Sequence, residues 1–176
     1  INSTGGITKQ GSGVLQFNAQ DNFTGAFTVA AGGIRNGVTN GGSRYSDLTL
    51  NSGTRYDLAG ISTTWGSLSG SGIIFNSGGT AANGGAAATL TVGFDNNPST
   101  TFSGQIERFN DANPSWVAIT KVGTGTLNMT SAQSASTGST GAFTVNGGTV
   151  SFNNAGAWFT GTTSPAFAGT FTVNEG

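Results

Sequence analysis

The sequence contains no cysteine and no histidine. Without cysteine there can be no disulfides and no thiolate metal sites, although this absence does not by itself identify a cellular compartment. Without histidine there can be no histidine-based catalytic triad and no imidazole metal site. Any catalysis or metal binding would therefore depend on carboxylates, and the chain has only seven Asp and Glu residues.

Charge is scarce as well. Charged residues make up 7% of the chain, against about 25% in an average soluble protein. The basic residues are scattered singly, at Lys9, Arg35, Arg44, Arg55, Arg108 and Lys121. Because nucleic-acid binding requires clustered Lys and Arg that displace counterions, we expect no nucleic-acid partner.

Long apolar runs are also missing. The longest spans only a few residues, far below the roughly 20 that a membrane-spanning helix needs. We therefore expect no membrane insertion by this segment. No signal peptide begins at Ile1, so we expect that any export signal has been removed or lies outside the segment.

Glycine and aromatic residues are abundant instead. The 31 glycines interrupt every window long enough for an amphipathic helix. The 12 Phe and 3 Trp, with a net charge of −1, argue against disorder, which is typical of chains with few aromatics and high net charge. Alternating apolar and polar residues at 13–19 and 26–30 indicate half-buried strands. These features predict an all-β fold.

The chain repeats itself. Residues 119–150 resemble residues 7–34: each copy opens with Ile-Thr-Lys, passes through Gly-x-Gly into an alternating strand, crosses a polar turn and closes on Ala-Phe-Thr-Val. A partial copy follows at 168–176. Such repeats favour a β-solenoid, in which coils of roughly 20 to 25 residues stack about 4.8 Å apart. Residues 1–176 then form a single solenoid segment, and we expect it to belong to a longer repeat array or filament.

The glycines of the Gly-x-Gly phrase are predicted to mark the corners where coils bend. Gly125→Val should therefore disrupt folding more than Thr124→Val. The two ends of the chain nearly continue each other, since Gly176 falls in the repeat phase of Gly148 and Gly32. This phase predicts end-to-end association with another copy or with neighbouring repeats.

The phrases and their order resemble the autotransporter-associated β-strand repeat family. The matching phrases are DLTLNSGT at 47–54, YDLAG at 56–60, GSLSGSG at 66–72, ATLTVG at 88–93, TFSGQI at 101–106 and ITKVGTGTL at 119–127. The resemblance covers nearly the whole chain, and the insert at 104–116 and the tail around Trp158 depart from it. It implies a right-handed parallel β-helix from the exported passenger region of a bacterial surface protein, located outside the cell or at the outer membrane.

Carboxylates are the remaining candidates for catalysis, as in glycoside hydrolysis. Asp47 and Asp57 lie ten residues apart on successive predicted strands, with Arg44 and Arg55 beside them. Surface salt bridges are the favoured interpretation, and a sugar-binding or lyase-like cluster is the alternative. The other acids are Asp21, Asp95, Glu107, Asp111 and Glu175. We expect no catalytic residues and a non-enzymatic protein.

No metal or cofactor site is predicted. Asp111, Asn113 and Ser115 imitate the first, third and fifth ligands of a calcium loop, but Trp116 replaces the glycine at position six and Val122 the glutamate at position twelve. Residues 95–97 (Asp-Asn-Asn) are oxygen-rich, and an Asx turn before Pro98 is the favoured interpretation.

Aromatic residues are the last candidates for a binding surface. Carbohydrate stacking along neighbouring coils could use Trp65, Trp116, Trp158, Tyr45 and Tyr56. Packing inside the coils is expected for Phe17, Phe27, Phe143, Phe152 and Phe171. Two functions stay open: a structural or adhesive rod that displays loops to a host surface or glycan, and a glycan-binding or glycan-cleaving module. Three exposed aromatics in a row along the rod would favour the second.

Overall fold

The computed structural model describes residues 4–78, 88–96, 99–108, 115–131, 141–153 and 171–173. These residues form strands, turns and loops, and every strand pair among them is parallel. In this part of the chain no helix is long and apolar enough to cross a membrane.

Three parallel sheets carry all of these strands. Sheet 1 has seven strands, in the order β1 (Ile7–Lys9), β3 (Phe27–Val29), β5 (Asp47–Leu50), β8 (Ser67–Gly70), β11 (Ser99–Phe102), β14 (Thr126–Met129) and β16 (Thr149–Phe152). Sheet 2 has five, in the order β2 (Val14–Phe17), β4 (Gly33–Asn36), β6 (Arg55–Asp57), β9 (Ile73–Asn76) and β12 (Gln105–Arg108). Sheet 3 has five, in the order β7 (Thr63–Trp65), β10 (Ala88–Val92), β13 (Val117–Lys121), β15 (Phe143–Val145) and β17 (Phe171–Val173).

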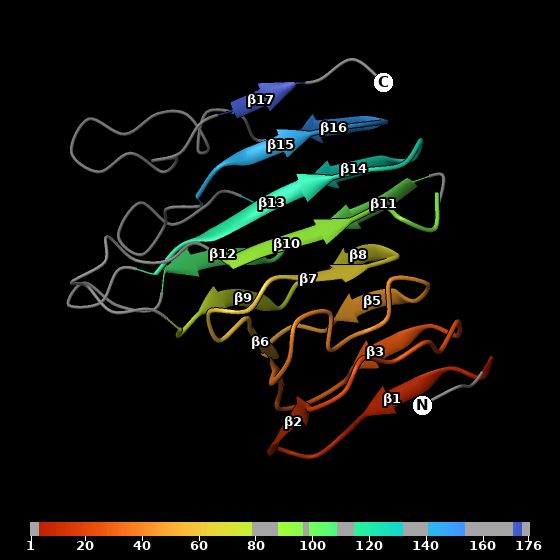
Figure 1. Ribbon diagram of the computed structural model, residues 1–176, viewed down its shortest axis with the longest axis vertical. Helices are drawn as coiled ribbons and strands as arrows, with labels where there is room; N and C mark the ends of the chain where they lie inside the picture. Colours follow the sequence, from red (N-terminus) through yellow and green to blue (C-terminus); the bar gives the residue numbers. More distant parts are fainter. Residues whose placement is uncertain are drawn as a thin grey trace.

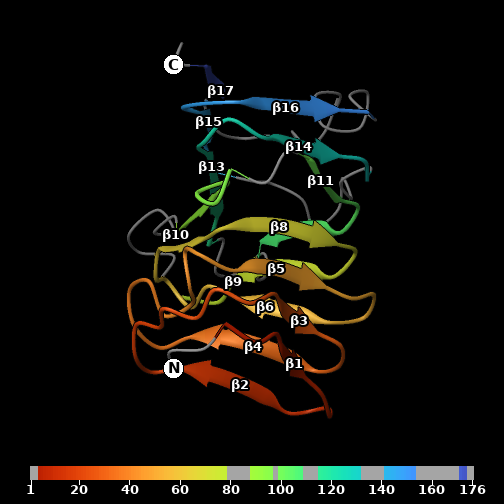
Figure 2. The same ribbon diagram turned by 90° about the vertical axis from the view of Figure 1, so that its right-hand side faces the viewer.

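The sheets are the faces of a solenoid whose ends lie far apart along its long axis (Figure 1). The chain runs to the right along the front in β10, then back to the left behind it in β11 and β12, and rises as it goes (Figure 1). Figure 2 shows the strands of sheet 1 stacked in order from β3 to β16. The coil is therefore right-handed, and the predicted all-β parallel β-helix is confirmed.

Strand register gives the length of each coil. Ile7 pairs with Phe27, Phe27 with Leu48 and Leu48 with Leu68, so each partner lies 20 or 21 residues further on, as expected. Two later coils are longer, because Gly70 pairs with Phe102 and Phe102 with Met129. The extra residues lie between strands and leave the sheet register unbroken.

The core consists of inward-facing side chains from the three sheets. Trp65 is fully buried at its centre, with the rings of Phe17, Phe23 and Phe27 at centroid distances of 5.9, 6.1 and 5.6 Å. Tyr56 is also fully buried, and its hydroxyl accepts a hydrogen bond from Trp65 Nε1 at 3.0 Å. Trp65 and Tyr56 are therefore core residues and cannot belong to a stacking stripe on the surface.

The prediction that phenylalanines fill the core is confirmed where the structure describes them. Phe17, Phe27 and Phe143 are buried, and Phe152 is partly buried against the core with its ring 5.3 Å from that of Phe143. The side chain of Phe171 lies outside the described part of the chain.

The two full repeats fold alike but occupy different faces. Ile7 begins a strand of sheet 1, whereas the matching Ile119 lies in sheet 3. Their corners nevertheless agree, since Gly11 and Gly123 have φ of +73° and +70°. The partial copy does stack on its predecessor, because Phe171 of β17 pairs with Phe143 of β15.

The lysine of each repeat binds the corner that follows it. Lys9 Nζ donates to the carbonyls of Gln10, Gly11 and Ala31, and Lys121 Nζ donates to those of Val122, Gly123 and Gly147. Lys121 is only 2% exposed. Burial lowers its pKa below the usual value, and the nearby charge of Asp95 acts in the opposite direction. The Thr-Lys-x-Gly phrase is thus a corner in which carbonyls of two coils surround one ammonium group.

Some strand boundaries differ from expectation. The sequence at 101–109 predicts a single strand, but the structure divides this region into β11 and β12. The break falls at Gly104, where a Cβ would lie 2.0 Å from the Gly72 carbonyl oxygen. Residues 157–160, also expected to form a strand, lie outside the described residues.

Candidate functional site

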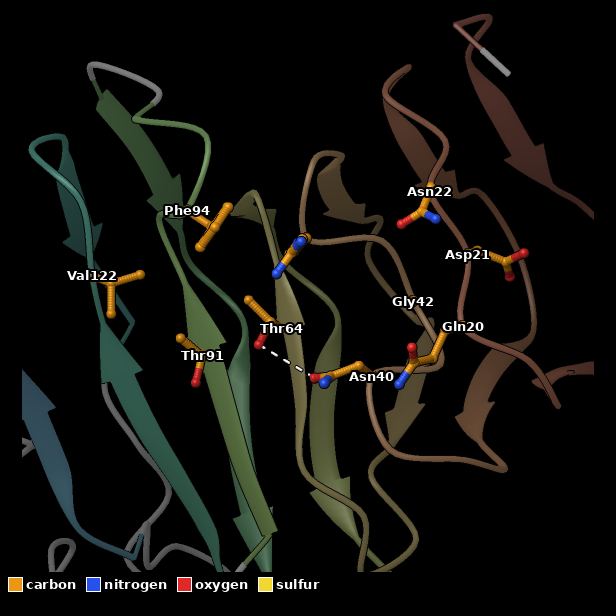
Figure 3. A pocket seen from close by; sticks show the side chains of 10 residues that line it. Gln20, Asp21, Asn22, Asn40, Gly42, Thr64, Thr91, Phe94 and Val122 are labelled. Carbon is orange, nitrogen blue, oxygen red and sulfur yellow. Dashed lines mark hydrogen bonds between the residues drawn. The ribbon is translucent and has the colours of Figure 1, made fainter. Parts of the chain in front are cut away.

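A groove of about 420 Å³ runs along the outside of sheet 3. Sheet 3 begins at β7, so in the first two coils this face is made of the loops at 18–26 and 37–46. Figure 3 shows the groove between those loops and the strands that follow, with Gln20 and Asp21 toward one end and Phe94 and Val122 toward the other. Residues from several coils therefore meet in one concave surface.

The loop at 37–46 is held tightly against the core. Gly42 lies so close to Trp65 that a Cβ there would be 2.4 Å from the indole ring. Ser43 Oγ donates to the Phe23 carbonyl at 2.5 Å and Ser46 Oγ to the Gly25 carbonyl at 2.6 Å. On the other side Gly66 N donates to the Ser46 carbonyl at 2.9 Å. The loop thus presents Arg44 and Tyr45 from a fixed backbone.

Arg44 lies over two exposed aromatic rings. Its Cζ is 4.9 Å from the centroid of Tyr45 and 5.1 Å from that of Phe94, and Nη2 donates to the Tyr45 hydroxyl at 2.7 Å. The two rings meet edge to face at 5.9 Å. Tyr45 is 39% and Phe94 44% exposed. Within the described residues no carboxylate lies within ion-pair distance of Arg44. Its charge is therefore available to a ligand.

Phe94 is positioned by a turn. Gly93 has φ +103° and donates its N–H to the Gly66 carbonyl at 2.7 Å, and Asn96 N donates to the Gly93 carbonyl at 3.2 Å. The favoured interpretation of residues 95–97 as an Asx turn before Pro98 stays a prediction, because Asn97 and Pro98 lie outside the described part of the chain. Asn96 Oδ1 also accepts from Thr124 N at 3.0 Å, which ties the turn to the next coil.

Polar side chains line the rest of the groove. Thr64 and Thr91 are register partners on β7 and β10, and Thr64 Oγ1 donates to Asn40 Oδ1 at 3.4 Å (Figure 3). Gln20, Asp21 and Asn22 form the opposite end (Figure 3). The surface combines hydroxyls, amides, one carboxylate, one guanidinium and an aromatic ring, a combination suited to binding a hydroxyl-rich molecule.

The acids singled out in the sequence do not form a pair. Asp47 is on β5 of sheet 1 and accepts a hydrogen bond from Ser67 Oγ, whereas Asp57 is on β6 of sheet 2. Asp57 accepts from Ser77 N and Oγ at 2.9 and 2.6 Å and lies 3.5 Å from Arg35 Nε. Two consecutive strands of a solenoid belong to different faces, so closeness in sequence does not bring these carboxylates together.

The arginines beside these acids also have other partners than expected. Arg55 Nη2 lies 3.7 Å from Glu107 Oε2, and its Cζ is 4.6 Å from the Phe75 ring centroid. Arg44 belongs to the groove. Asp57 and Arg55 thus each form an ion pair with a residue from another coil, although Asp57 itself is buried rather than on the surface.

Other predicted site residues are scattered. Asp111 and Asn113 of the imitated calcium loop lie outside the described residues, and Ser115 is buried. In the described ranges no three His, Cys, Asp or Glu side chains gather to hold a metal ion. Of the aromatics proposed for stacking, Trp116 is partly buried, Trp158 is outside the described residues, and Tyr45 is exposed.

Sequence reasoning missed Phe94. Leu90, Val92 and Phe94 alternate as one strand would, which predicts an inward Phe94. The positive φ of Gly93 ends the strand at Val92 and turns Phe94 outward. The adjacent Asp-Asn-Asn-Pro turn signal could have indicated that the strand ends before Phe94.

Comparison with known proteins gives one informative similarity. Over 148 residues, 82% of the chain, the sequence is 35% identical to the Adhesin BmaC autotransporter of Brucella suis biovar 1 (strain 1330). The chain spans only 4% of the length of that protein. No protein-family model matches the chain, and no solved structure matches it.

Three parallel sheets coiled in one direction define a β-solenoid segment. Together with the similarity to an autotransporter, this fold assigns the chain to the passenger-type β-strand repeats of autotransporters. The segment accordingly belongs to an exported protein of the bacterial cell surface, which confirms the expected location.

Proposed function

We propose that the chain is one stretch of a longer adhesive rod that holds binding loops away from the bacterial surface. The similarity to an adhesin supports the adhesive role. The anchored loop at 37–46 supports loop display, because its hydrogen bonds to both neighbouring coils fix an exposed surface on a regular scaffold. The separation of Asp47 and Asp57 onto different sheets supports a non-enzymatic role.

Stacking of successive repeats is the route by which such a rod would lengthen. The partial copy pairs with the preceding copy in register, with Phe171, Thr172 and Val173 opposite Phe143, Thr144 and Val145. A neighbouring repeat, or the end of a second copy, can extend the same ladder. We therefore propose end-to-end continuation of this segment, as a stretch of a longer array or as a subunit of a filament.

Adhesion can be measured directly. The chain is displayed on a non-adherent bacterium, and adherence to layers of host epithelial cells is compared with that of the same strain displaying an unrelated β-solenoid. We expect increased adherence only with this chain. Equal adherence of the two strains, at equal surface levels of the two proteins, would reject the adhesive role.

A further inference from the structure

We propose that the groove along sheet 3 binds a carboxylate-bearing glycan, with the acidic group at Arg44 and the sugar ring against Phe94. This inference deepens the proposed adhesive function and rests on it, because it names the class of ligand that the rod would hold. It concerns the residues that line the groove from Gln20 to Phe94.

The guanidinium of Arg44 provides the charge recognition. Arg44 is exposed, points over Phe94, and has no ion-pair partner among the described residues. By contrast, Arg35 and Arg55 on sheet 2 each lie beside a carboxylate. A guanidinium forms parallel hydrogen bonds with a carboxylate, and its weak hydration lowers the cost of leaving water.

Arg44 is preorganised by the rings of Tyr45 and Phe94 and by the turn that holds Phe94. Tyr45 accepts a hydrogen bond from Nη2, and both rings lie within about 5 Å of Cζ. The backbone on each side is tied to neighbouring coils, through Ser43 and Ser46 for Arg44 and through Gly93 for Phe94. A side chain already held in its binding position loses less conformational entropy when a ligand arrives.

The polar lining suits sugar hydroxyls rather than a peptide or a lipid. Thr64, Thr91 and Asn40 offer hydroxyl and amide groups along the middle of the groove, and Gln20 and Asn22 offer amide groups at the far end (Figure 3). Phe94 and Val122 add apolar surface at the other end of the groove, against which the face of a sugar ring can pack. The volume of about 420 Å³ lies within the range of ordinary ligand sites.

The charges also give the ligand a direction. Asp21 lies at the end of the groove away from Phe94 (Figure 3), whereas the guanidinium of Arg44 lies over Phe94. The acid of the ligand is therefore held at the Arg44 end. Uronic-acid and sialic-acid glycans share this carboxylate chemistry, and the test below separates them.

Calorimetric titration of the purified chain tests the proposal with two matched pairs of probes. Trigalacturonate is compared with its uncharged methyl ester, and 3′-sialyllactose with lactose. We expect at least one acidic probe to bind about tenfold or more tightly than its neutral counterpart. This preference should weaken as salt rises, because screening reduces the attraction between charges. The probe that binds identifies the uronate or the sialate as the source.

Substitutions test the position of the site. Arg44→Gln should remove the preference for the acidic probe, whereas Phe94→Ala should weaken both members of a pair. Arg35→Gln is the matched control, because Arg35 is an exposed arginine on sheet 2 and outside this groove. Thermal unfolding of each variant shows that it is folded.

Three results would overturn the proposal: no binding of any probe, equal binding of acidic and neutral probes, or equal losses in Arg44→Gln and Arg35→Gln. If the displayed chain adheres to cells and Arg44→Gln leaves this adherence unchanged, the glycan site is wrong and the adhesive role stands. If the chain binds an acidic probe but gives no adherence, the proposed adhesive role is wrong instead.

Discussion

Tyr56 and Trp65 show how single residues in this fold join two coils. Tyr56 Oη donates to Asn36 Oδ1 at 2.9 Å and accepts from Trp65 Nε1 at 3.0 Å, all inside the core. Asn36 Nδ2 in turn donates to the Ile61 carbonyl at 3.0 Å. A buried network of this kind is stable only while each member keeps its partners.

Alkaline pH should expose the contribution of Tyr56. Burial raises its pKa to about 12 from an ordinary value of 10, although hydrogen bonds with Trp65 and Asn36 act in the opposite direction. Between these two values the unfolded chain loses the phenolic proton while the folded chain keeps it. The free energy of unfolding should therefore fall by about 2 to 3 kcal/mol as pH rises through this window.

Urea denaturation of the wild type and of Tyr56→Phe at several pH values measures this effect. The variant should be less stable near neutral pH, by about 1 to 3 kcal/mol, because Trp65 Nε1 and Asn36 Oδ1 lose a partner. The difference between the two proteins should then shrink as pH rises from 10 to 12. The lowered pKa of Lys121 has the opposite sign but is common to both proteins. A constant difference across the window would contradict the assignment.

Phe143 tests the packing of the repeated strand. It is fully buried and its ring meets that of Phe152. Phe143→Ala should reduce the free energy of unfolding by about 3 to 5 kcal/mol through lost transfer energy and the cavity left behind. The exposed Phe94 provides the control, since Phe94→Ala should cost much less. Equal melting temperatures for Phe143→Ala and the wild type would show that the side chain does not pack in the core.

At the scale of elements, the corners decide whether strands can follow one another. The sequence predicts that the Gly-x-Gly phrase is a corner and that Gly125 is the position where a side chain is not tolerated. Gly125 is absent from the glycines with positive φ, whereas Gly123 has φ +70° and a Cβ there would lie 2.1 Å from the Gly93 carbonyl oxygen. The close approach of two coils and the left-handed backbone both fall two residues earlier.

Valine substitutions along the corner at 123–125 should therefore rank in a definite order. Gly123→Val should be the most disruptive, because it combines a steric clash with a backbone conformation that β-branched residues avoid. Gly125→Val should still cost more than Thr124→Val, since Gly125 is buried and Thr124 is exposed. Soluble yield and urea midpoints give the ranking. Tolerance of Gly123→Val equal to that of Thr124→Val would exclude this corner geometry.

At the scale of the whole molecule, the two full repeats lie on different faces of the solenoid. The copies at 7–34 and 119–150 begin on sheet 1 and sheet 3, so the same phrase presents its strands on different faces. The partial copy lies on the same face as its predecessor, with Phe171 opposite Phe143. The same sequence phrase can therefore form strands on either of two faces of the solenoid.

Self-association can be observed on the isolated 176-residue chain. If ladders extend from one copy to the next, sedimentation should show species larger than the monomer, and electron microscopy should show end-to-end contacts with strands spaced at about 4.8 Å. Raising the concentration should lengthen the assemblies. A stable monomer at every concentration would reject assembly into filaments and leave covalent continuation within a longer rod as the remaining form of the proposal.

The sequence by itself determined the all-β class, the repeated strand units, the glycine corners and the phenylalanine core. These features depend on local alternation and on backbone conformations that few residues other than glycine adopt, so they can be predicted without knowing the fold. The resemblance of the ordered phrases to autotransporter repeats added the parallel solenoid.

Only the tertiary structure decided which residues meet. Arg44, Thr64 and Phe94 are distant in sequence, and they share a groove because each lies at the same angle around successive coils. The same geometry separates Asp47 from Asp57 despite their closeness in sequence. In a solenoid the neighbours of an outward side chain come from the coils above and below, and the length of every intervening loop sets their alignment. Local sequence patterns do not encode that alignment. The residues that form the binding surface could therefore be identified only from the fold.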